Sequence, residues 1–298
     1  YPTVGSKMRS RQQISAILFL VFALQVLSIS DTLAKYMSAS LPLLQVIWAR
    51  FFFHCFVTGA YSAALYGFGA LTPTVSMRLL ARSAALFVAV GLFYVVIHFM
   101  PLTTALPLWF VAPFLLTLMA RIFFQEEVSA IQWMAIVVGF AGIVMAIRPS
   151  PDTWEWTYLV GLLAGFGYAV FLLLTRLIET DIPPIVSVYQ TGLVGCIAST
   201  AAVGMVWQQP AVTDWPILIA IGVVAALAHL LIIMAFEKAE ASTLAPFTYA
   251  EVIGAALLGY VVFGDAPDMT ACVGLGIIVL SAIIVARYSK AAEAEAAA

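Results

Sequence analysis

Ionisable residues interrupt several long apolar stretches of this sequence, and Arg50, Asp31 and Glu251 are the clearest of them. A charge within hydrocarbon is costly unless it faces a partner or a water-filled space, so each is a candidate functional residue. Arg50 carries a planar guanidinium that holds a carboxylate or phosphate through two hydrogen bonds. His54 follows Arg50 by one helical turn and is expected on the same face. The spacing predicts a site for an anionic group of a solute.

Asp31 allows a second interpretation of Arg50. At about 1.5 Å per residue the two side chains lie at almost the same depth in their spans, and Lys35 follows Asp31 by one turn. A structural Asp31–Arg50 ion pair fits the sequence as well as a substrate-binding Arg50 does. Both hold if the pair opens to admit an anionic group.

Glu251 lies near the middle of an apolar stretch that reads "APFTYAEV" and contains no basic residue. A buried carboxyl group without a counter-charge is suited to carry a proton or to bind a substrate cation. A neutral carboxyl hydrogen-bonded to a neighbouring helix is the structural alternative. His229 joins Glu251 as a candidate for ion coupling, although a single histidine in a helical bundle is more often a packing residue.

Four aromatic residues fall deep within apolar segments: Trp109, Tyr94, Tyr168 and Tyr249. Their rings are suited to stack on a flat group or to face a cation. The three cysteines match no metal-ligand spacing, so neither a metal nor a cofactor is predicted.

The composition identifies the elements that must carry these residues. Apolar side chains make up 64% of the 298 residues and charged ones 9%, with a mean hydropathy of +1.07. Soluble domains are roughly 45–50% apolar and about 25% charged. We therefore predict an all-α polytopic membrane protein embedded in a lipid bilayer. The ten predicted spans are 14–36, 42–66, 80–100, 103–124, 129–148, 156–178, 183–207, 215–236, 241–263 and 270–288. Pro107, Pro113 and Pro246 are expected to break the fourth and ninth spans.

Lysine and arginine positions predict the orientation, because cytoplasmic loops keep the positive charge. With the N-terminus inside, the cytoplasmic cations are Lys7, Arg9, Arg11, Arg78, Arg82, Arg121, Arg176, Lys238, Arg287 and Lys290. Only Lys35 and Arg148 lie at outer ends. Both termini are therefore expected in the cytoplasm, across a bacterial inner membrane.

The chain also contains an internal duplication. A shift of 139 residues pairs Thr104 with Thr243, Pro107 with Pro246, Phe124 with Phe263, Glu126 with Asp265 and Arg148 with Arg287. A shift of 141 pairs Lys35 with Arg176, Pro42 with Pro183 and Trp48 with Tyr189. Five spans per copy would insert the second copy upside down, which is the architecture of many secondary transporters. We predict repeats at 14–148 and 156–288, an N-terminal tail at 1–13 that begins with a short non-native leader, and a C-terminal tail at 289–298.

Each copy ends in a stretch that resembles the EamA repeat of the drug/metabolite transporter superfamily. The first reads "LTTALPLWFVAPFLLTLMARIFFQEEVSAIQWMAIVVGFAGIVMAI" and the second "ASTLAPFTYAEVIGAALLGYVVFGDAPDMTACVGLGIIVLSAIIVARY". The stretch "SDTLAKYMSASLPLLQVIWARFFF" is similar to those of bacterial S-adenosylmethionine uptake transporters, and riboflavin transporters are also similar. The resemblance implies a ten-helix importer or exchanger of an organic metabolite. Asp265 stands where many relatives have Glu and keeps the carboxylate.

Together these features predict a secondary transporter, not an enzyme, for a small carboxylated or zwitterionic metabolite that works by alternating access. The sequence contains no P-loop, so ATP is not expected to drive transport. A net charge of -2 gives no reason to expect a nucleic-acid partner. A drug or amino-acid exporter of the same fold is the nearest alternative. A membrane enzyme acting on a lipid or prenyl substrate is an alternative from another class, and no oligomeric state is predicted.

Overall fold

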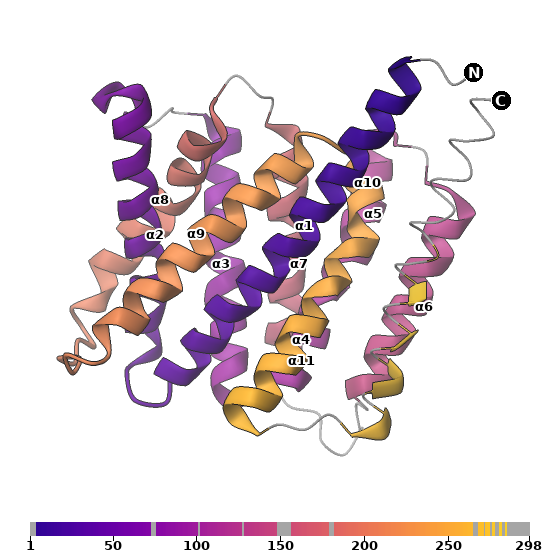
Figure 1. Cartoon of the computed structure of the whole chain (residues 1–298). Coiled ribbons are helices and arrows are strands. Elements are labelled where there is room, and N and C mark those ends of the chain that lie inside the picture. Colours follow the sequence, from indigo (N-terminus) through magenta and orange to yellow (C-terminus); the bar gives the residue numbers. More distant parts are fainter. Residues whose placement is uncertain are drawn as a thin grey trace.

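The protein is described from a computed structural model. It covers residues 4–72, 76–100, 102–126, 128–147, 156–178, 182–264 and, within 268–284, all but 271, 275, 278, 279, 282 and 283. This part of the chain is helical and contains no strand (Figure 1). The predicted all-α class is therefore confirmed for the described residues.

The longer helices carry most of the bundle. They are α1 (Val4–Met37), α2 (Leu43–Tyr66), α3 (Met77–Phe99), α6 (Ala130–Ile147), α7 (Trp156–Leu177), α8 (Pro184–Val203) and α9 (Trp215–Phe236). The shorter elements are η1 (Phe68–Leu71), α4 (Leu102–Trp109), α5 (Val111–Phe123), α10 (Ala241–Leu244), η3 (Ala245–Ala250), α11 (Glu251–Leu258) and η4 (Gly259–Phe263).

Within the described part of the chain, six helices are long and apolar enough to cross a membrane: those at Gln12–Met37, Leu43–Tyr66, Met77–Phe99, Trp156–Leu177, Pro184–Val203 and Trp215–Phe236. Shorter apolar helices occur at Val111–Phe123, Ala130–Gly142 and Phe247–Phe263. The chain is therefore a multi-pass membrane protein, and its helices fit the ten predicted spans. The predicted span 270–288 lies largely outside the described residues.

Two of the predicted spans are interrupted in the way that their prolines predict. The span 103–124 divides into α4 and α5 at Phe110. Pro113 has no N–H to donate to the carbonyl of Trp109, so a continuous helix would lose that hydrogen bond. The span 241–263 divides into α10, the 3-10 turns of η3, α11 and the π-helical end η4.

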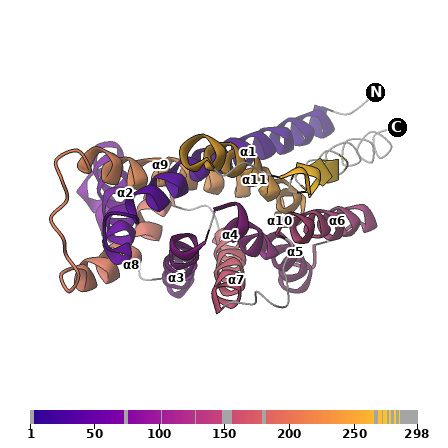
Figure 2. The ribbon, with the colours of Figure 1, turned by 90° about the horizontal axis from the view of Figure 1, so that it is seen from below.

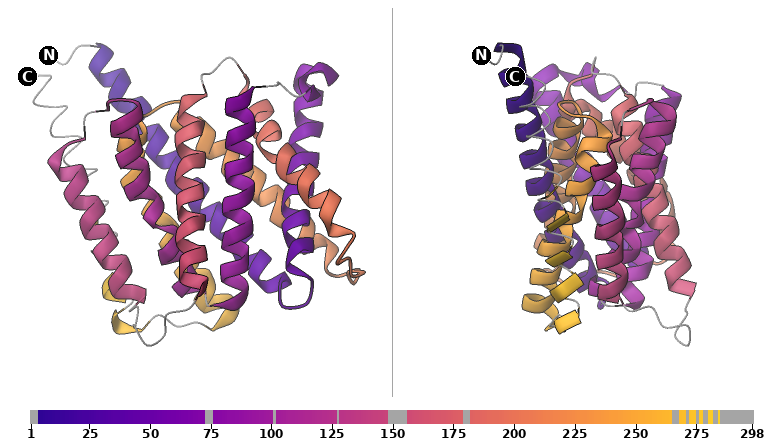
Figure 3. Two further views of the ribbon diagram at one scale, coloured as in Figure 1. Left: turned by 180° about the vertical axis from the view of Figure 1, so that it is seen from behind. Right: turned by 90° about the vertical axis from the view of Figure 1, so that its right-hand side faces the viewer.

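The helices form two rows when seen along the bundle, and Figure 2 shows α2, α9, α1 and α11 in one row and α8, α3 and α7 in the other. Helix α1 packs along α9, α3 packs along α7, and α2 packs along α8. Figure 3 shows the same thin, two-layered arrangement from the side. The polar interior described below lies between these rows.

Close approach of α2 and α9 depends on Gly222. A Cβ atom built there would lie 2.7 Å from the backbone nitrogen of His54 and 2.9 Å from the backbone oxygen of Arg50. Backbone atoms cannot move aside without separating the two helices. Glycine is therefore required at this crossing.

We expect Gly222→Ala to lower the melting temperature of the purified protein, because overpacking of this kind costs about 1–3 kcal/mol. Gly91→Ala in α3 is the matched control, since a Cβ there meets no atom within 4 Å. Alanine is a better helix former than glycine, so the control is expected to melt at the same or a higher temperature. Equal melting temperatures for the two variants would contradict the steric argument.

Candidate functional site

A buried ion pair lies at the centre of the bundle. Arg50 on α2 donates from Nη1 to Oδ1 of Asp31 on α1 at 3.0 Å, and both residues are buried. The same nitrogen donates to Ser30 Oγ at 3.0 Å and to the hydroxyl of Tyr94 on α3 at 2.8 Å. The Arg50 guanidinium also faces the Tyr94 ring at 5.4 Å from its centroid. Three helices therefore converge on one cation, whose charge is balanced by Asp31.

Glu251 begins α11 and is 1% exposed. Its backbone oxygen accepts a hydrogen bond from Ser28 Oγ at 3.2 Å, which ties α11 to α1. The side-chain atom Oε2 has no hydrogen-bond partner within the described part of the chain. Asp31 and Arg50 lie within electrostatic reach of this carboxyl group. Glu251 therefore belongs to the same polar interior as the ion pair.

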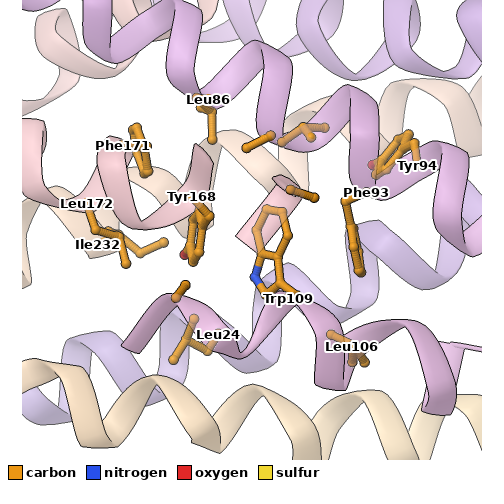
Figure 4. Packing of buried hydrophobic residues seen from close by; sticks show 14 of the residues in the cluster. Leu24, Leu86, Phe93, Tyr94, Leu106, Trp109, Tyr168, Phe171, Leu172 and Ile232 are labelled. Atoms are coloured by element: carbon orange, nitrogen blue, oxygen red, sulfur yellow. The ribbon is translucent and has the colours of Figure 1, made fainter. Parts of the chain in front are cut away.

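An aromatic wall adjoins these charges. Trp109 at the end of α4 stacks on Tyr168 of α7, with ring centroids 4.4 Å apart. Phe93 of α3 packs on the other side of Trp109 at 4.7 Å. Figure 4 shows Trp109 and Tyr168 side by side among Leu86, Phe93 and Leu24. Trp109 is the last residue of α4, directly before the break, and it is buried.

The two interior histidines lie against each other. His54 on α2 and His229 on α9 have ring centroids 5.6 Å apart. His54 Nε2 lies 3.2 Å from the carbonyl of Val188, and His229 Nδ1 lies 2.8 Å from the carbonyl of Ala225. Phe171 lies 5.6 Å from His229 and 5.8 Å from Tyr168. The histidine pair is therefore joined to the aromatic wall.

Several buried polar atoms lack a hydrogen-bond partner among the described residues, and four of them belong to the aromatic wall, the histidine pair and Glu251. These four are Trp109 Nε1, the Tyr168 hydroxyl, His229 Nε2 and Glu251 Oε2. Leaving such an atom unsatisfied costs about 1–3 kcal/mol. These atoms come from α4, α7, α9 and α11, so both halves of the sequence contribute. An interior with these unused groups is suited to hold a polar molecule.

Two predicted site residues point elsewhere. Lys35 donates from Nζ to the carbonyls of Met100 at 2.7 Å and Ile97 at 3.2 Å, at the C-terminal end of α3. A cation stabilises that end of a helix by binding its last carbonyl groups. Tyr249 directs its hydroxyl toward the carbonyl of Ile136 on α6 at 3.5 Å, and its ring lies against Gly139. Tyr249 therefore contacts α6 and the residue between α4 and α5 in this structure.

Arg82 is an interior cation that the sequence interpretation assigned to the cytoplasmic loops. That assignment is wrong, because α3 begins at Met77 and Arg82 is 1% exposed. Arg82 Nη2 donates to the carbonyl of Ser187 on α8 at 2.8 Å and to Ser187 Oγ at 2.9 Å, and also to Thr191 Oγ1. Arg82 already lay inside the predicted span 80–100, close to its start, and was counted with the loop cations on its charge alone.

No group of three or more histidine, cysteine, aspartate or glutamate residues suited to a metal ion occurs among the described residues. The site is therefore built from one compensated arginine, one uncompensated carboxyl group, two histidines and stacked aromatic rings. These features place the protein in the class of polytopic α-helical membrane proteins with a buried polar core.

Within this class the chain belongs to the EamA-like transporter family, whose profile matches residues 14–148 and 155–287. The predicted family is thereby confirmed.

Three transporters are similar to this chain over 63%, 88% and 93% of its length. The S-adenosylmethionine uptake transporter of Rickettsia bellii (strain RML369-C) is 24% identical over 263 residues, which cover 88% of this chain and 90% of the relative. The riboflavin transporter of Vibrio cholerae serotype O1 (strain ATCC 39315 / El Tor Inaba N16961) is 30% identical over 190 residues, 63% of each chain. The pseudopaline exporter of Pseudomonas aeruginosa (strain UCBPP-PA14) is 27% identical over 293 residues, 93% of this chain and 97% of the exporter.

A solved crystal structure shares the fold. Its TM-score is 0.76 at 18% identity, and the match covers 94% of this chain and 99% of that chain. At this level of identity the similarity describes the fold alone.

Proposed function

We propose that this protein is a secondary transporter that binds a small carboxylated or zwitterionic metabolite in the interior described above. The observation that carries the proposal is the set of four buried polar atoms without partners, contributed by α4, α7, α9 and α11. A solute that satisfies these atoms recovers the free energy that each of them forfeits. Trp109 and Tyr168 would contact its flat ring, and Glu251 would bind its cationic group or carry a coupling proton.

The packing of the helices supports an inverted repeat as the basis of alternating access. Under the 139-residue shift Phe110 corresponds to Tyr249, and their rings lie 5.8 Å apart. Residues that correspond to each other meet in this way on a pseudo-two-fold axis. The pairings α1–α9 and α3–α7 exchange under the same operation, while α2 packs on its own counterpart α8. Two such halves can adopt mirrored states that open to opposite sides.

The distribution of cations supports an N-terminus on the cytoplasmic side of a bacterial inner membrane. Arg78 lies at the start of α3, Arg121 and Arg176 lie near the ends of α5 and α7, and Lys238 follows α9. Successive helices alternate in direction, so these positions lie at the end of the bundle where α1 begins (Figure 1). An excess of positive charge is typical of the cytoplasmic side.

The named relatives suggest the chemistry of the solute. S-adenosylmethionine carries a flat heterocycle, a sulfonium cation and an amino-acid head, which match an aromatic wall and interior charges of both signs. Riboflavin shares the flat heterocycle. We therefore propose S-adenosylmethionine or a solute of the same chemistry, taken up or exchanged. The similarity to a pseudopaline exporter favours export as the second candidate.

Counterflow in proteoliposomes tests the proposal directly. Vesicles preloaded with unlabelled S-adenosylmethionine are expected to accumulate the labelled solute, and vesicles without the protein are not. Oriented vesicles with outward or inward gradients then distinguish uptake from export. Absence of counterflow, together with no ligand-induced change in melting temperature, would overturn the proposed solute.

Tyr168→Phe separates ligand binding from folding. The substitution removes a buried hydroxyl without a partner in the described structure, so the melting temperature without solute is expected to stay the same or rise. The increase in melting temperature caused by saturating solute is expected to shrink, because one ligand contact is lost. Tyr260→Phe is the control, since Tyr260 is exposed. A lower melting temperature with an unchanged ligand effect would assign Tyr168 a purely structural role.

A further inference from the structure

The described interior contains two arginines, and only one of them is paired with a charged side chain. Arg50 is balanced by Asp31 at 3.0 Å. Arg82 is equally buried, yet its acceptors are one carbonyl and two hydroxyl groups of α8, none of which carries a charge. No carboxylate among the described residues forms an ion pair with it. A buried cation without a counter-charge is strongly unfavourable unless an anion binds beside it.

Arg82 also retains unused hydrogen-bond donors. All its hydrogen bonds to described residues run through Nη2, and Nε has no partner among them. The Thr191 hydroxyl donates to the carbonyl of Ser187 at 2.7 Å, and the Ser187 hydroxyl oxygen accepts from Arg82 Nη2 at 2.9 Å, which leaves the Ser187 proton to be donated. A guanidinium edge and a neighbouring hydroxyl proton are the groups that bind a carboxylate.

The position of Arg82 places it at one end of the polar interior. Arg82 precedes Tyr94, a contact of Arg50, by 12 residues on α3, which is about 18 Å of helix. His54 lies between these levels through its contact with Val188, the residue after Ser187. His229 is within electrostatic reach of both arginines. The two histidines therefore provide polar groups between Arg82 and the central site.

From this arrangement we infer that Arg82, with Ser187 and Thr191, forms an anion site that receives the carboxylate of the transported solute at the α3 N-terminal end of the interior. The inference rests on the proposed function and deepens it. It assigns the anionic end of the solute to Arg82, in place of the compensated Arg50. The cationic or aromatic end is then left to Glu251, Trp109 and Tyr168.

The test compares two ligands that differ by one carboxylate, S-adenosylmethionine and decarboxylated S-adenosylmethionine. Binding is measured with the full chain in nanodiscs of phosphatidylcholine, which has no net charge and supplies no anionic lipid. Arg82→Gln is expected to weaken S-adenosylmethionine binding by about tenfold or more and to leave the decarboxylated ligand nearly unchanged. Arg82→Lys keeps the charge and is expected to lose less.

Two further variants control for structure. Ser83→Ala removes another hydrogen bond between α3 and α8, from Ser83 Oγ to the carbonyl of Gln190 at 3.0 Å, and is expected to bind both ligands as the wild type does. Ser187→Ala leaves the Arg82 charge in place, so it provides the test if Arg82→Gln does not fold. It is expected to weaken only the carboxylated ligand.

The outcomes separate this inference from the proposed function. If wild type binds S-adenosylmethionine but the Arg82 and Ser187 variants lower the affinity for both ligands equally, or for neither, the anion site is overturned and the transporter stands. If the wild type binds neither ligand, the proposed solute and the anion site are both overturned.

Discussion

Asp31→Leu and Arg50→Met, made singly, are each expected to lower the melting temperature strongly, and the double variant is expected to recover most of that loss. Each single change strands its partner's charge among buried residues, which costs about 3–5 kcal/mol. Replacing both charges with apolar side chains of similar size removes the need for a pair and is often neutral or stabilising. Thermal unfolding of the four proteins in one detergent completes the double-mutant cycle.

Transport by the double variant separates the two interpretations of Arg50. If the ion pair only holds α1, α2 and α3 together, the refolded double variant transports at a rate near that of wild type. If Arg50 leaves Asp31 to bind the solute, the double variant is stable and inactive. Single variants that melt as the double variant does would show that the pair contributes no coupling energy.

The fold could be predicted largely from hydropathy because helices in lipid must satisfy their backbone groups internally and need a fixed apolar length. The predicted span 215–236 coincides with α9, and 156–178 differs from α7 by one residue. The largest differences lie at aqueous ends, where hydropathy carries little information. The helix α1 begins at Val4, ten residues before the predicted start, and α8 ends at Val203, four before the predicted end.

The interior was harder to predict than the spans. Asp31 and Arg50 could be paired because the position of a residue along its span gives its depth in the membrane, and these two depths agree. Rotation about the helix axis depends on packing, so nothing indicated that Tyr249 would turn toward α6 or that Lys35 would bind the end of α3. Arg82 was misplaced for a different reason: a cation near a span end lies in a loop or in the core depending on one helical turn.

Glu251→Gln is expected to reduce the rate of solute transport by about tenfold or more. An interaction of the solute with a charged group contributes roughly 1.5–3 kcal/mol, and this interaction is lost. The amide keeps the shape of the side chain and carries no charge, so the melting temperature is expected to remain near that of wild type or to rise. Glu240→Gln is the matched control, since Glu240 is exposed in the connection between α9 and α10.

Two transport measurements on Glu251→Gln distinguish the roles left open for this carboxyl group. Counterflow needs solute binding but no ion gradient, whereas uptake driven by an imposed pH gradient also needs a group that carries the proton. Loss of gradient-driven uptake with retained counterflow would assign Glu251 to proton coupling, and loss of both would assign it to the cationic end of the solute. Wild-type rates in both assays would remove Glu251 from the site, because its uncompensated burial would then serve neither binding nor coupling.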